Sequence, residues 1–81
     1  MANFPIDMPL EDPFEFGSER VEKITIARKP TVRDIRGIGN LSPTDQSIKI
    51  LEKVAGITPA MVDRISLTDF GRISERVASF L

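Results

Sequence analysis

The chain has 81 residues, a net charge of −1, and no cysteine, histidine, tryptophan or tyrosine. The missing cysteine and histidine exclude disulfides, thiolate or imidazole metal sites, and Ser–His or Cys–His nucleophilic pairs. A carboxylate-only active site would need a pocket that so short a chain has little interior to form, so we expect no enzyme, no cofactor and no metal.

Leucine, isoleucine, valine and phenylalanine together make up about a third of the chain, which indicates one domain with a real apolar core. A domain of this size buries only about 60–65% of its unfolded surface, so we expect marginal stability and help from homo-oligomer formation. No apolar run approaches the roughly 18 residues of a membrane span. Residues 1–7 lack the basic and apolar regions of a signal peptide, so we expect a cytoplasmic protein.

Charge is distributed unevenly along the sequence. Residues 1–22 hold six acids and one base, whereas residues 23–36 hold five bases and only Asp34. A nucleic-acid-binding regulator could use the basic segment 23–36. We favour a solvent-exposed basic face instead, because no aromatic residue lies among these bases to stack on nucleotides.

The first predicted segment is a flexible, acidic, proline-containing arm over residues 1–12. Proline removes backbone donors and fixes φ, so an arm with Pro5 and Pro9 is expected to be extended or disordered until it is bound. Phe4, Ile6 and Met8 alternate with other residues, a period that would let the arm add to a sheet edge, its own or a neighbour's.

A single α+β domain is predicted over residues 13–81, beginning with a β-hairpin over 13–28. Phe14 and Phe16 alternate with charged residues, Gly17 provides turn chemistry, and Ile24 and Ile26 share one face of the second strand. A hairpin alone is marginally stable, so this apolar face must pack on helices or on another subunit.

Three to four short helices follow, near 31–37, 43–55, 59–65 and 67–80. Three of them start with Ser or Thr followed three residues later by Asp, as in Ser42-Pro43-Thr44-Asp45. The remaining start is Thr58-Pro59, with proline at its preferred first helical position.

The last helix carries an apolar stripe at helical spacing, which is either core packing or a partner-binding surface. Together with the hairpin phenylalanines it supplies the candidate protein-interface residues, some expected within the fold and some between chains: Phe14, Phe16, Phe70, Ile73, Val77, Phe80 and Leu81.

The segment Arg36-Gly37-Ile38-Gly39-Asn40 is similar to the turn of a helix-hairpin-helix DNA-binding motif. However, residues 39–48 contain no Lys or Arg to bind a phosphate, so we interpret the segment as a connecting loop.

From Pro13 to Leu81 the order of these features resembles the phage tail assembly chaperones of Mu-like and P2-like contractile-tailed phages. The resemblance depends on Ile24-Thr25-Ile26-Ala27-Arg28-Lys29-Pro30-Thr31-Val32-Arg33-Asp34-Ile35-Arg36, which is similar to that family's alternating strand, basic-Pro corner and Asp-containing helix. A second match runs from Gly56-Ile57-Thr58-Pro59 through Ser66-Leu67-Thr68-Asp69-Phe70 to Phe80-Leu81.

The resemblance implies a non-enzymatic protein that binds the phage tape measure protein in the host cytoplasm while tail tube subunits polymerise around it, and the tail tube protein is a second candidate partner. The alternatives are the nucleic-acid-binding regulator and a minor structural tail protein that remains in the virion.

Overall fold

Two antiparallel strands form the first third of the molecule, and four helices follow them in the computed structural model, which describes residues 3–80. The elements are β1 (Ile6–Phe16), β2 (Glu19–Ile26), α1 (Val32–Ile35), α2 (Pro43–Ala55), α3 (Pro59–Val62) and α4 (Leu67–Ala78). The predicted α+β class, with a hairpin ahead of short helices in one small domain, is confirmed.

The hairpin is longer than the sequence predicts, because β1 begins at Ile6 rather than at Pro13. Ile6 pairs with Ile26 and Met8 pairs with Ile24, so residues assigned to the arm form the first half of β1. Ile24 and Ile26 are buried, and the cross-strand residues that help to cover them come from this segment. The alternating apolar residues of the arm therefore extend the chain's own sheet. Residues 1 and 2 lie outside the described part of the chain.

A bulge interrupts the pairing in the middle of β1. Pro9 is opposite Lys23 and Phe14 is opposite Val21, so the four residues between Pro9 and Phe14 face a single residue of β2. Proline has no N–H to donate to a ladder, and bulges are one of the few places where strands accommodate it. Within the bulge, Leu10 is buried in the core.

The helices begin at the predicted capping residues. The hydroxyls of Ser42, Thr58 and Ser66 each accept the backbone N–H of the residue three positions later. The first helix has a different arrangement, in which the Asp34 carboxylate accepts the backbone N–H of Thr31 at 2.8 Å. At the other end of α2, Gly56 adopts φ +63°, a conformation that favours glycine, and donates its N–H to the Glu52 carbonyl.

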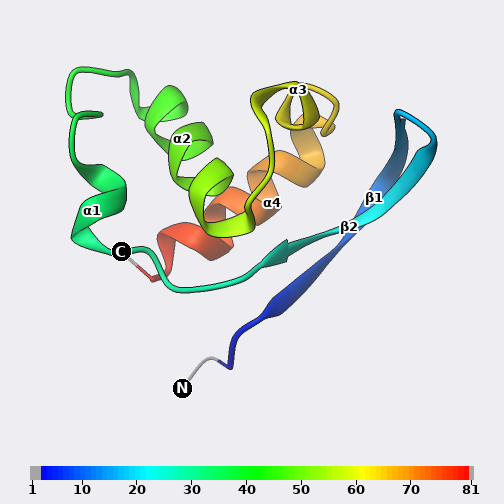
Figure 1. Ribbon diagram of the computed structural model, residues 1–81, viewed down its shortest axis with the longest axis horizontal. Helices are drawn as coiled ribbons and strands as arrows, with labels where there is room; N and C mark the ends of the chain where they lie inside the picture. Colours follow the sequence, from blue (N-terminus) through cyan, green and yellow to red (C-terminus); the bar gives the residue numbers. More distant parts are fainter. Residues whose placement is uncertain (1–2, 81) are drawn as a thin grey trace.

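The helices pack against the hairpin around one apolar core (Figure 1). α2 is central: it contacts β2 and the three other helices, while α4 also contacts β1. The Ala27 N–H donates to the Val54 carbonyl at 2.8 Å and joins the end of β2 to α2. The buried cluster contains Leu10, Phe14, Ile24, Ile26, Ile38, Ile50, Leu51, Val54, Ile65, Ile73 and Val77. Among residues 3–80, no helix is long and apolar enough to cross a membrane.

Candidate protein-interaction surface

Three of the candidate interface residues lie in the core. Phe14, Ile73 and Val77 are 9%, 0% and 4% exposed, so in this conformation they have little surface to offer a partner. Their packing joins the hairpin to α4 and thereby positions the rest of that helix.

Three other candidates are half-buried and retain some accessible surface. Phe16 and Phe70 pack at the margin of the core. The Phe80 ring lies 5.1 Å from the Phe4 ring between centroids, and the Arg76 guanidinium lies 5.3 Å from the Phe80 ring centroid. The seventh candidate, Leu81, lies outside the described residues.

A shallow apolar groove of about 210 Å³ lies among α2, α3 and the start of α4. Leu67 is 88% exposed at its rim, whereas Val62 and Ile65 within it are buried. Of the candidates chosen from the sequence, only Phe70 lines this groove; its full lining is Thr44, Ile48, Val62, Asp63, Ile65, Leu67 and Phe70.

Leu67 is a surface residue that sequence reasoning missed. It directly follows the capping residue Ser66, where the helix pattern gives no core assignment. An exposed leucine beside buried apolar residues continues the apolar surface outward, and such continuity is typical of a protein-binding groove.

A buried carboxylate links α4 to the β1 bulge, a long-range contact that the capping pattern alone does not predict. Asp69 is 0% exposed and accepts the backbone N–H groups of Glu11 and Asp12, each at 3.0 Å. It also accepts hydrogen bonds from the Arg72 guanidinium at 2.8 Å and the Ser66 hydroxyl at 3.1 Å. Burial by itself raises the pKa of Asp69, but the four donors outweigh it and lower the pKa to about 2.

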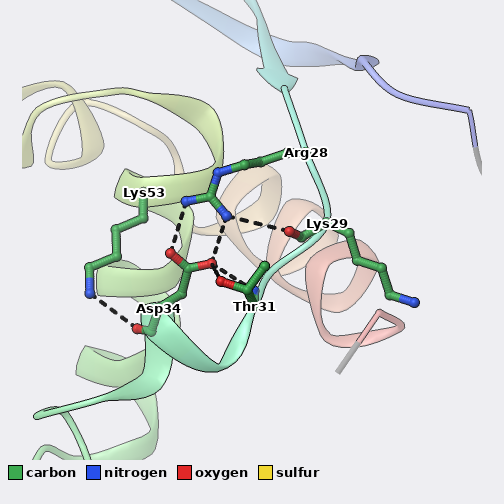
Figure 2. Close-up of polar contacts among 5 residues, drawn as sticks. All are labelled: Arg28, Lys29, Thr31, Asp34 and Lys53. Atoms are coloured by element: carbon green, nitrogen blue, oxygen red, sulfur yellow. Dashed lines mark hydrogen bonds and ion pairs between the residues drawn. The ribbon is translucent and has the colours of Figure 1, made fainter.

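A second buried carboxylate fixes the corner between β2 and α1 (Figure 2). Both oxygens of Asp34 accept hydrogen bonds from Arg28, at 2.7 and 2.8 Å. The Arg28 guanidinium, followed by the backbone N–H of Thr31, holds the pKa of Asp34 well below its usual range. Lys53 of α2 donates to the Asp34 backbone carbonyl at 3.1 Å and ties the corner to the helical layer.

These contacts divide the basic segment 23–36 into paired and unpaired residues. Lys23 lies 3.2 Å from Asp7 and Arg28 binds Asp34, so two of its five bases have acidic partners. Lys29, Arg33 and Arg36 are exposed and form no ion pair with any residue from 3 to 80. In the loop that follows, Ile38 is buried in the core, which agrees with the connecting-loop interpretation of Gly37–Asn40.

The sequence matches a protein family model. No curated protein matches the sequence, and no solved structure does. A family model described as "Phage tail assembly chaperone proteins, E, or 41 or 14" matches residues 7–81, which include all six strands and helices except Ile6 at the start of β1. The resemblance seen in the sequence is thereby confirmed, and the chain belongs to this family of phage tail assembly chaperones.

Proposed function

We propose that the protein acts as a non-enzymatic chaperone that binds the tape measure protein during phage tail morphogenesis in the cytoplasm of the host, with the tail tube protein as the second candidate partner. Membership of the chaperone family over residues 7–81 supports the role in tail assembly. The apolar groove among α2, α3 and α4 is the observation that supports binding of a helical partner.

The groove has the properties of a helix-binding surface. A long, largely helical protein that awaits its enclosing tube exposes apolar stripes, and an amphipathic helix places such a stripe into an apolar groove. Leu67 at the rim and Val62 at the floor would contact the stripe at two depths. A groove this shallow suits reversible binding, and several chaperone copies along one partner would add avidity to weak single contacts.

Co-expression with the tape measure protein from the same genome tests the proposal. We expect a soluble complex that purifies together and a tape measure protein that aggregates when the chaperone is omitted. A tape measure protein that is soluble alone and never co-purifies with the chaperone would refute this function.

A pair of variants then tests the groove itself. Leu67→Glu places a charge on the apolar rim and is expected to weaken tape measure binding by about tenfold or more, since a charge must be desolvated in the complex. Thr68→Glu adds the same charge at the neighbouring exposed position, outside the groove, and is expected to bind like the parent. Equal binding by both variants would show that the tape measure protein does not contact the groove.

A further inference from the structure

The corner formed by Lys29 and α1 holds apolar side chains in solvent. Val32 is 67% exposed and Ile35 is 48% exposed, and within this four-residue helix only Asp34 is buried. An isolated helical turn is unstable, because the entropy lost in fixing its backbone dihedrals outweighs the free energy of its few hydrogen bonds. Here the bidentate Arg28–Asp34 pair and Lys53 hold the turn in place (Figure 2). The partly exposed Arg28–Asp34 ion pair therefore stabilises a turn whose two apolar side chains lie outside the core.

Positive charge surrounds this apolar pair. With Arg28 neutralised by Asp34, the unpaired bases of the corner are Lys29, Arg33 and Arg36, a net charge of +3. Figure 2 shows the Lys29 ammonium pointing away from the Arg28–Asp34 pair. Val32, Arg33 and Arg36 line one open depression, so apolar and cationic groups share a single surface. We name this surface, Lys29 with Val32–Arg36, the basic corner.

The outer half of the hairpin carries the opposite charge. Residues 11–22 contain five acids and one base, a net charge of −4, and all five acids are exposed. Arg20, the single base, pairs with Glu22 at 3.3 Å and Glu15 at 4.0 Å, and the side chains of Glu11, Asp12 and Glu19 form no ion pair among residues 3–80. Phe16 and Val21 lie half-buried in the same segment. We name residues 11–22 the acidic tip.

The basic corner and the acidic tip lie at opposite ends of the long axis of the molecule (Figure 1). One chain therefore cannot bring them together, but two chains arranged head to tail can. The two surfaces are complementary, because each combines accessible apolar side chains with charged ones and their net charges have opposite signs.

We propose that the basic corner of one copy binds the acidic tip of a second copy. Such an interface is heterologous, because two different surfaces of the same chain meet, so repetition gives a ring or an open row of subunits rather than a symmetric dimer. The association uses neither the groove nor the tape measure protein, so it stands independently of the proposed function. A row of chaperones would also present one groove per subunit in a regular series.

Sedimentation velocity over a range of concentrations at low and high salt tests self-association. We expect the mass-average mass of the parent chain to increase with concentration at about 50 mM salt and to return toward that of the monomer at about 500 mM, where charge interactions are screened within a few ångströms. A parent chain that stays monomeric at millimolar concentration and low salt, or associates equally at both salt concentrations, would overturn the proposal.

A charge swap tests which surfaces meet. The corner variant Lys29→Glu/Arg33→Glu/Arg36→Glu changes the net charge of the corner from +3 to −3, and the tip variant Glu15→Lys/Glu19→Lys/Glu22→Lys changes that of the tip from −4 to +2. Each variant therefore places like charges at the interface and is expected to weaken self-association by about tenfold or more. An equimolar mixture of the two variants restores opposite charges at both contacts and is expected to associate within about threefold of the parent. Circular dichroism establishes that both variants are folded.

A control variant and a test for a different occupant of the corner complete the experiment. Arg64→Glu changes an exposed base in neither surface and is expected to associate like the parent. Failure of the folded mixture to associate would overturn the proposal. So would a monomeric parent chain that binds duplex DNA through Arg33 and Arg36, since the corner would then serve a nucleic acid.

Discussion

Asp69, in the first turn of α4, accepts the backbone N–H of Glu11 at 3.0 Å across 58 residues of sequence. Its other carboxylate oxygen accepts the N–H of Asp12, so two consecutive donors of the β1 bulge are satisfied by one side chain. Arg72 completes the link by donating to both the Pro9 carbonyl and Asp69. The bulge, which has lost its ladder partners in β2, is therefore hydrogen-bonded to the helical layer instead.

Asp69→Asn should destabilise the fold although it preserves the shape of the side chain. An asparagine offers one oxygen and one NH₂ group, so either the Glu11 or the Asp12 N–H would face a donor rather than an acceptor. A buried donor left unsatisfied costs about 1–3 kcal/mol, measurable as a decrease in the free energy of unfolding in urea. Asp45→Asn is the matched control: Asp45 has the same capping position in α2 but is exposed, and its replacement should cost less than about 0.5 kcal/mol. Equal losses in the two variants would contradict the role of Asp69.

Acid should destabilise the protein between about pH 4 and pH 2. The pKa of Asp69 is lowered from 3.8 to about 2 in the folded chain, and that of Asp34 is also lowered, so in this window the unfolded chain binds more protons than the folded one. The free energy of unfolding then decreases as the pH falls, and the contribution of these groups is fully present above about pH 5. Urea titrations at stepped pH values measure the slope. The Asp69→Asn variant should show a shallower decrease, whereas parallel curves for variant and parent would exclude Asp69 as a source.

Asp45 and Asp69 show which structural features the local sequence predicts and which it does not. Ser42-Pro43-Thr44-Asp45 and Ser66-Leu67-Thr68-Asp69 predict the same capped helix start, and both serine hydroxyls accept the expected N–H. One aspartate remains exposed while the other is buried against β1. The capping pattern does not distinguish the two aspartates, because the burial of Asp69 depends on a bulge almost sixty residues away.

The extent of β1 and the lining of the groove also depend on residues that are distant in the sequence. The alternation at Ile6 and Met8 is compatible with a strand, whereas Pro5 and Pro9 favour an extended arm. The pairing of Ile6 with Ile26 and of Met8 with Ile24, which decides between the two, is visible only in the structure. The stripe of α4 predicted Ile73 and Val77 as apolar contacts, and both are buried. Leu67 could not be recognised, since a solitary leucine at a helix start becomes a groove rim only when α3 lies beside it.

Arg28→Lys should loosen the corner between β2 and α1. Lysine retains the charge but cannot donate the two parallel hydrogen bonds, at 2.7 and 2.8 Å, that Arg28 gives to the buried Asp34. Because Arg28 is itself partly exposed, we expect a loss of only about 1 kcal/mol in the free energy of unfolding, with faster hydrogen exchange at Thr31, whose N–H donates to Asp34. Arg33→Lys, at an exposed position in the same turn, should leave both measurements unchanged. Slow exchange at Thr31 in the Arg28→Lys variant would show that the corner does not depend on the pair.

Alanine substitutions along α4 should separate core from margin. Ile73 is fully buried, so Ile73→Ala removes apolar contacts and leaves a cavity, at a cost of about 2–5 kcal/mol. Phe80 is half-buried at the end of the same helix, where it meets the Phe4 ring at 5.1 Å and the Arg76 guanidinium at 5.3 Å. Phe80→Ala should therefore cost about 2 kcal/mol, since it loses the partial burial of the ring as well as the roughly 1 kcal/mol that an aromatic pair adds. Thermal and urea unfolding measure both variants. A Phe80→Ala chain that fails to fold would place Phe80 in the core, whereas a small loss leaves its accessible face free to contact another chain.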